Sequence, residues 1–141
     1  MRWLALDIGS RRVGVAVSDA DEKVASPLRA IPYLGPERLA EAVTELARTW
    51  AAEGVVVGVP RTRAGHSRGE FRVSTIVAAL ERRLGLPVET MDESGTTAAA
   101  EALLTEAGTP RRRWQELVDS LAARLILEMH LARRRSPTHG R

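Results

Sequence analysis

Apolar and polar residues recur along the chain with two different periods, and the period predicts which element each segment forms. Short apolar or alternating runs are typical of strands, and they cover Trp3–Ile8, Val13–Val17, Val24–Tyr33, Val55–Val59 and Val88–Met91. Apolar residues spaced three or four apart are typical of helices, and they cover Glu37–Ala52, Glu70–Leu84, Gly95–Glu106 and Trp114–Arg133.

The order of these segments predicts an α/β fold. Three successive strands, the first two joined by a tight turn at Gly9–Arg12, favour an antiparallel meander. The strands and helices that follow favour parallel β-α-β units, so we expect a mixed five-stranded sheet with helices on both faces. Residues 1–135 are long enough for one domain with its own core, and residues 136–141 form a basic tail that we expect to fray.

Composition narrows the class of protein. Hydrophobic residues make up 44% of the chain and charged residues 28%, as in ordinary globular domains. The absence of cysteine excludes disulfides and thiolate metal sites. Because no signal peptide or membrane-length apolar stretch is visible, we expect a cytoplasmic protein without membrane contacts. All the basic residues except Lys23 are arginine, which suits phosphate binding but would equally follow from an arginine-rich proteome.

Four carboxylates fall at places where such folds bind ligands. Asp7 ends the first strand, Asp92 and Glu93 end the last, and Asp119 lies early in the last helix, beside small residues. Each alone has an ordinary explanation, as a turn residue or as an acid at a helix start. One shared explanation covers them all, because the crevice beyond strand ends is the usual ligand site of these sheets.

Clustered carboxylates repel one another unless a cation lies between them. Ligands that are all oxygen select hard ions such as Mg²⁺ or Mn²⁺. Two such ions, about 3.5–4 Å apart, stabilise the attacking and leaving oxygens in phosphodiester hydrolysis. The pattern therefore predicts nuclease chemistry.

Four segments in chain order resemble the YqgF (RuvX) family, and together they span nearly the whole chain. They are Asp7–Asp19, Gly58–Pro60, Asp92–Thr97 and Asp119–Leu127. The resemblance implies the RNase H-like fold of the Holliday junction resolvases. It also implies a metal-dependent nuclease that resolves Holliday junctions, trims the 5′ end of pre-16S rRNA, or does both.

The same resemblance assigns roles to the acids. Asp7 and Asp119 match the acids of the first strand and the last helix, and the middle acid is Asp92 or Glu93, with a slight preference for Glu93. These four are the candidate catalytic residues and the candidate ligands of one or two Mg²⁺ or Mn²⁺ ions. The chain departs from the family at Ser94–Gly95, where an Arg-Leu pair is usual, so a basic residue that could contact phosphate is missing.

Arginines near the expected site are candidate contacts for a nucleic acid, either structured RNA or branched or single-stranded DNA. They are Arg11, Arg12, Arg61, Arg63, Arg68, Arg111 and Arg112. The alternative is a solvated arginine face, which we favour for Arg133–Arg135. If junctions are the substrate, two symmetric cuts predict a C2 homodimer, although nothing in the sequence identifies a dimer face.

Two other functions compete with the nuclease. One is a non-catalytic nucleic-acid-binding protein on the same fold. The other is a sugar-kinase or actin-like phosphotransferase, whose ATP site also begins with Asp-x-Gly before a hairpin, but the chain is too short for two such lobes. Among the remaining residues, Trp3, Trp50 and Trp114 are expected in the core, His130 at the surface or an interface, and His66 is a candidate proton-transfer group.

Overall fold

The computed structural model describes residues 1–60, 68–93 and 95–135, with side chains except at 60, 68–71, 93, 115 and 116. Its five-stranded sheet has the order β3-β2-β1-β4-β5. The strands are β1 (Trp3–Ile8), β2 (Arg12–Ser18), β3 (Ala25–Pro32), β4 (Gly54–Pro60) and β5 (Val88–Glu93). The helices are α1 (Pro36–Trp50), α2 (Arg68–Leu84), α3 (Thr96–Glu106) and α4 (Trp114–Arg135), with a short 3₁₀ turn, η1 (Arg111–Arg113), before α4.

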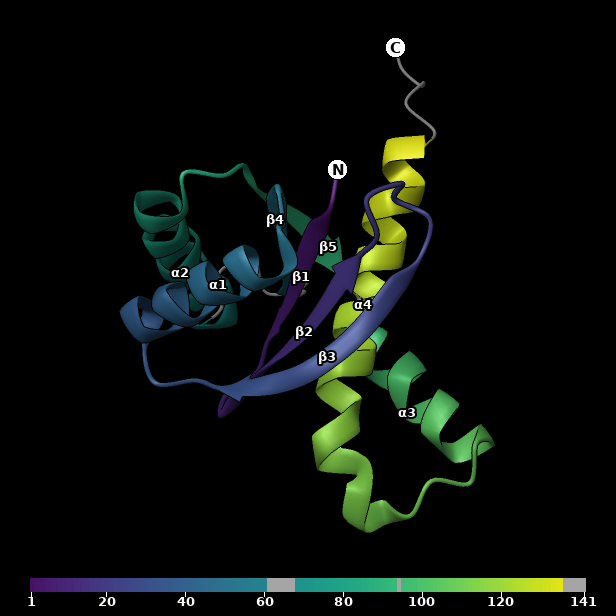
Figure 1. Cartoon of the computed structure of the whole chain (residues 1–141). Helices are drawn as coiled ribbons and strands as arrows, with labels where there is room; N and C mark the ends of the chain where they lie inside the picture. Colours follow the sequence, from purple (N-terminus) through teal and green to yellow (C-terminus); the bar gives the residue numbers. More distant parts are fainter. Residues whose placement is uncertain (61–67, 94, 136–141) are drawn as a thin grey trace.

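The pairing of the strands confirms the predicted fold class. β1, β2 and β3 form an antiparallel meander, and β4 and β5 continue the sheet in parallel from the other side of β1. Figure 1 shows α1 and α2 on one face of this sheet and α4 along the other. The parallel pairing of β1, β4 and β5 brings the carboxyl ends of these three strands to one edge.

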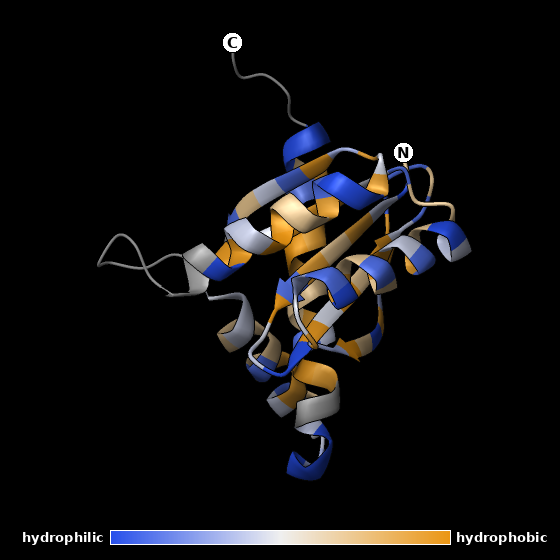
Figure 2. Ribbon diagram, turned by 90° about the vertical axis from the view of Figure 1, so that its left-hand side faces the viewer, coloured by the Kyte–Doolittle hydropathy of each residue, from blue (hydrophilic) through white to orange (hydrophobic). Residues whose placement is uncertain are grey.

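Alternate residues of each strand contribute to two separate cores. On one face, Leu4 and Leu6 of β1 pack with buried residues of α1 and α2. On the other, Trp3 and Ala5 pack with α4 residues that include Ile126. The apolar segments accordingly concentrate in the sheet and in the helices covering it (Figure 2). Asp7 continues the series of Trp3 and Ala5, so its position in β1 lies on the α4 face.

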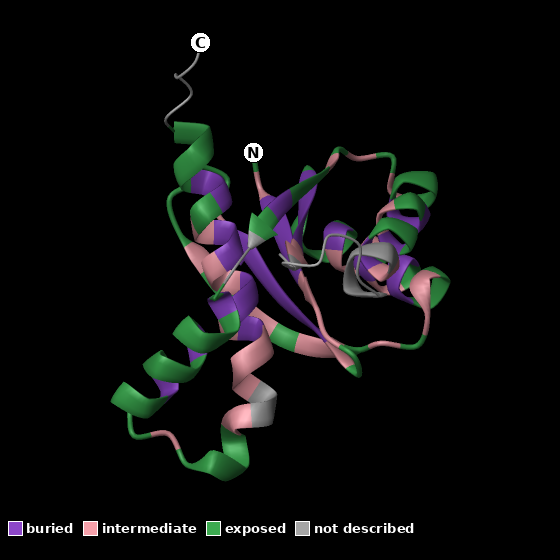
Figure 3. Cartoon of the chain, turned by 180° about the vertical axis from the view of Figure 1, so that it is seen from behind, coloured by how far each residue is buried: buried purple, intermediate pink, exposed green. Residues whose placement is uncertain are grey.

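α3 packs against α4 and not against the sheet. With the first turns of α4 it forms a helical hairpin that extends beyond the sheet, and most of α3 is exposed (Figures 1 and 3). The last helix, α4, is buried in its middle, where Ala123, Ile126 and Leu127 are fully buried, but not at its ends. Among the described residues, none of the helices is long and apolar enough to cross a membrane.

α4 is fixed to the rest of the domain on both sides of its middle. The Ser120 hydroxyl donates a hydrogen bond of 2.5 Å to the backbone oxygen of Leu28 in β3. Near the other end, the Arg134 guanidinium donates to the Glu22 carboxylate at 2.7 Å and lowers the pKa of Glu22 to about 2. Because Asp119 directly precedes Ser120, the first of these contacts also fixes the position of Asp119.

Two predictions about individual side chains were wrong. Trp50 is 39% exposed at the end of α1, where its backbone oxygen accepts a hydrogen bond from Arg2. His130 is fully buried, with its ring packed edge-on against Trp3 at 4.4 Å between centroids. The imidazole lies on the face of α4 that packs on the sheet, beside Trp3, and Ile126, Leu127 and Leu131 of α4 belong to the same core. Trp3 is buried as expected, and Trp114 is half-buried.

The burial of His130 makes the stability of the protein sensitive to pH. Within the described part of the chain, neither imidazole nitrogen has a hydrogen-bond partner, and burial lowers the pKa of His130 below 6.5. As pH falls below 6.5, the unfolded chain takes up a proton that the folded chain does not, so stability falls by up to about 1.4 kcal/mol per pH unit. We expect His130→Leu to remove this loss, as measured by urea unfolding at pH 7.5 and 5.5. An equal loss in the variant would contradict the assignment to His130.

Candidate active site

Asp7 is paired with a glycine on each of its two neighbouring strands. Its partner on β2 is Gly14, and its partner on β4 is Gly58. Glycine has no side chain, so another part of the chain can approach the sheet closely next to Asp7. Asp7 itself is partly buried.

Gly14 brings Asp119 to this same place. A Cβ atom at Gly14 would overlap the backbone carbonyl of Asp119, so the backbone of α4 lies directly on the sheet at this glycine. Gly14 is directly opposite Asp7 in the antiparallel pair, and such partners have Cα atoms about 4.5–5.5 Å apart. Asp7 and Asp119, which are far apart in the sequence, therefore lie beside each other.

The role of Gly14 was missed in the sequence. The signal that could have found it is a lone glycine inside a β-branched strand, which often marks the close approach of another backbone. Here the approaching backbone is that of α4.

Arg12 completes this part of the site. Its Nε–H donates to Oδ2 of Asp119 at 3.3 Å, and the two side chains are 38% and 23% exposed. A hollow of about 300 Å³ is lined by Asp119 and by the turn residues Gly9, Ser10, Arg11 and Arg12. One acid and two arginines thus line one small cavity at the end of β1.

The backbone of β5 separates its two acidic positions. Met91 packs on the α4 face with Trp3, whereas Val88 packs on the face covered by α1 and α2. Successive residues of a strand face opposite sides of the sheet, so Asp92 lies on the same face as Val88, away from Asp7. Asp92 is exposed. Position 93 lies on the same face as Met91. It pairs with Pro60 of β4, which is two residues beyond Gly58, the residue of β4 that pairs with Asp7.

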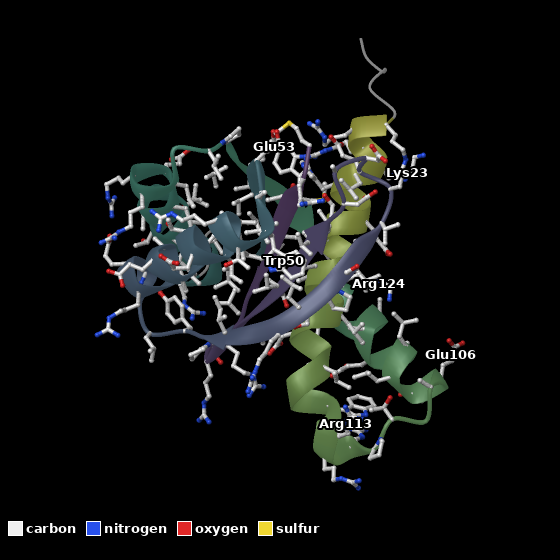
Figure 4. All side chains as sticks on the ribbon, in the orientation of Figure 1. Lys23, Trp50, Glu53, Glu106, Arg113 and Arg124 are labelled. Carbon is white, nitrogen blue, oxygen red and sulfur yellow. The ribbon has the colours of Figure 1, made fainter. Side chains whose placement is uncertain are left out.

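The other predicted phosphate contacts are distributed around the site. Arg11 is exposed in the turn between β1 and β2. Arg111 lies over the ring of Trp114 at 4.2 Å, and Arg112 is exposed beside it in η1. Figure 4 labels Arg113 at this end of the helical hairpin. Asp119 follows it within two helical turns along α4. Arg61, Arg63 and His66 lie outside the described residues, as does the side chain of Arg68.

The described side chains supply only part of a metal site. No three carboxylates or histidines among them lie close enough together to hold an ion by themselves, and the side chain of Glu93 is not among those described. Asp7 and Asp119, which lie beside each other, carry carboxylate oxygens, and these suit hard divalent cations. A cation, the Arg12 guanidinium, already lies at one of them.

Comparison with known proteins identifies the family. The model of a family described as "RuvX: Holliday junction resolvase" matches residues 1–133. The chain belongs to the RuvX family. A RuvX relative from Chloroflexus aggregans, named "Putative pre-16S rRNA nuclease", is 41% identical over 138 residues and 95% of each chain. A protein of the same name from Desulforudis audaxviator is 41% identical over 138 residues, covering 96% of this chain and 97% of its own.

Solved structures of low sequence identity share the fold of this RuvX-family chain. RuvC of Thermus thermophilus, solved in complex with Holliday junction substrate, has a TM-score of 0.62 at 18% identity, with 98% of each chain covered. The fowlpox virus Holliday junction resolvase has a TM-score of 0.55 at 13% identity, covering 94% of this chain and 99% of its own. The predicted RNase H-like fold and the family resemblance are both confirmed.

Proposed function

We propose that this RuvX-family chain is a divalent-metal-dependent nuclease that hydrolyses phosphodiester bonds in nucleic acid. The observation that carries the proposal is the contact between the backbone of Asp119 and Gly14, which places Asp119 beside Asp7. Relatives named as pre-16S rRNA nucleases and the junction-binding resolvases of the same fold support the substrate class.

The residues present fit one or two Mg²⁺ or Mn²⁺ ions. Asp7, Asp119 and Glu93 would hold them, since these three positions share the α4 face of the sheet edge. When bound, such ions activate water and stabilise the negative charge that develops on the phosphate oxygens.

The chain's own residues supply the rest of the reaction. The contact of α4 with Gly14 and the Ser120 hydrogen bond to Leu28 hold the carboxylate of Asp119 in place. Arg11 and Arg12, in the hollow beside Asp119, can donate several hydrogen bonds to a phosphate group. The arginines of η1, which directly precede α4, are further candidate contacts for phosphate.

The experiment that tests this function compares three substrates with each metal. Purified protein is incubated with a four-way DNA junction, a single-stranded DNA and a precursor of 16S rRNA that retains its 5′ extension, with Mg²⁺, Mn²⁺ or EDTA. We expect metal-dependent cleavage of the precursor or the junction, and none in EDTA. Binding without cleavage under every condition would instead support a non-catalytic nucleic-acid-binding protein.

The alternation of β5 predicts which acid of the pair is used. We expect Glu93→Gln to reduce the cleavage rate by more than about 100-fold, because it removes a negatively charged metal ligand. Asp92→Asn is the matched control, since it changes the adjacent acid on the other face, and it should cost less than about threefold. Equal losses in the two variants, measured as initial rates at saturating metal, would show that the alternation does not decide the role.

Contacts to phosphate predict a steep dependence of binding on salt. Log affinity falls linearly with log salt, and each phosphate contact that is lost should make this negative slope shallower by nearly one. We therefore expect Arg11→Gln and Arg111→Gln each to make the slope shallower, as measured by fluorescence anisotropy between 50 and 200 mM salt. A slope identical to that of the unmodified protein would exclude the altered residue from the phosphate path.

A further inference from the structure

Arg12 and Asp119 form an ion pair at the place where the proposed function requires a metal ion. The contact uses Nε of Arg12 and Oδ2 of Asp119 at 3.3 Å, which is longer than the usual 2.7–2.9 Å of a charge-assisted hydrogen bond. Arg12 is 38% exposed, and a pair at this level of exposure contributes little stability. The contact is therefore one that a stronger cation can replace.

The backbone permits such an exchange without a change of fold. Arg12 and Gly14 are alternate residues of β2, so both lie on the α4 face, and Gly14 holds the backbone of Asp119. Asp119 is thus fixed, whereas the guanidinium of Arg12 is at the end of a long, partly exposed side chain. The adjoining hollow of about 300 Å³ leaves room for that guanidinium beside Asp119.

We propose that Arg12 neutralises Asp119 in the metal-free protein and exchanges with the divalent cation that binds there. This inference rests on the proposed function, and it adds a regulatory step to that site. A divalent cation held by the Asp119 carboxylate would repel the Arg12 guanidinium that donates to the same carboxylate. Arg12, once released, is available to donate two parallel hydrogen bonds to a phosphate of the nucleic acid. Binding of metal and binding of substrate are coupled in this way.

The test measures the affinity for Mn²⁺ in the absence of nucleic acid. Isothermal titration calorimetry is done on the unmodified protein and on Arg12→Gln, Arg12→Lys, Asp119→Asn and Arg38→Gln. Since the competing cation is absent in Arg12→Gln, we expect this variant to bind Mn²⁺ about three- to tenfold more tightly. Arg12→Lys keeps the charge and should bind Mn²⁺ within about twofold of the unmodified protein. Arg38→Gln, at an exposed arginine of α1 on the other side of the sheet, controls for the change in net charge and should also stay within about twofold.

Thermal unfolding gives a second readout that does not depend on cleavage. A bound ligand raises the unfolding midpoint in proportion to the logarithm of its concentration over its Kd. At a fixed Mn²⁺ concentration, the midpoint should rise further in Arg12→Gln than in the unmodified protein. A purely structural role of Arg12 would lower the midpoint with and without metal and leave the rise unchanged.

The outcomes separate this inference from the proposed function. If the unmodified protein binds Mn²⁺ and Asp119→Asn does not, the metal site stands. Equal or weaker Mn²⁺ binding by Arg12→Gln then overturns the exchange alone. If the unmodified protein binds no Mn²⁺, or Asp119→Asn binds it equally well, the proposed metal site fails and the exchange fails with it.

Discussion

Asp7→Asn and Asp119→Asn are each expected to reduce the rate of nucleic-acid cleavage by more than about 100-fold while the protein remains folded. Asp7 and Asp119 lie beside each other because the backbone of α4 at Asp119 contacts Gly14, the residue opposite Asp7. An amide keeps the size of the side chain but loses the negative charge that binds a hard cation, so metal affinity and cleavage should fall together. Initial rates over a range of Mg²⁺ and Mn²⁺ concentrations measure both effects.

Asp21→Asn is the matched control for these variants. Asp21 is an exposed acid in the loop after β2, at the opposite end of that strand from the turn that carries Arg11 and Arg12. Its replacement should leave the cleavage rate within about twofold, and all three variants should change the free energy of unfolding by less than about 1 kcal/mol. Undiminished cleavage by Asp7→Asn or Asp119→Asn would contradict the assigned site.

Gly14→Ala is expected to have the second large effect, on stability and activity at once. The added methyl group would overlap the backbone carbonyl of Asp119, so α4 must move away from the sheet. Overpacking of this kind costs about 1–3 kcal/mol, and the helix also carries a proposed metal ligand. Because a displacement of about 1 Å at a reactive centre can cost about 100-fold in rate, we expect the folded fraction of this variant to be nearly inactive.

Gly85→Ala separates loss of stability from distortion of the site. Gly85 has a positive φ of 67°, which strains alanine, but a Cβ there meets no other atom within 4 Å. It lies between α2 and β5, at the opposite end of β5 from Glu93. We expect this variant to lose about 1–2 kcal/mol of stability and to cleave at the normal rate below its unfolding temperature. A Gly14→Ala protein as active as Gly85→Ala would show that the close approach of α4 has no role in the reaction.

The sequence was sufficient to predict the elements and their arrangement, because each has a local cause. The apolar periods defined the strands and helices to within a few residues, and the meander followed from short connections between the first three strands. The 3₁₀ turn at Arg111–Arg113 was missed, since three consecutive arginines have no apolar period. The burial of His130 and the exposure of Trp50 also escaped prediction, because both depend on how closely a helix approaches the sheet.

The candidate site was predicted as a set of residues but not as an arrangement. The acids could be named because each ends a strand or begins a helix. Which of Asp92 and Glu93 lies on the α4 face depends on the register of β5 against β4, and this pairing is not local in sequence. The Arg12–Asp119 contact joins residues 107 positions apart, and it depends on the close contact between the backbone of α4 and Gly14. These are tertiary facts with no local signature apart from the glycine itself.

Asp7 and Asp119 are proposed to hold a divalent cation between them. The most direct measurement is anomalous X-ray scattering from crystals of the protein soaked with Mn²⁺. We predict one or two manganese peaks within about 2–2.5 Å of carboxylate oxygens of both residues. Manganese bound elsewhere, or no peak beside Asp7 and Asp119 at a concentration that supports cleavage, would contradict the account.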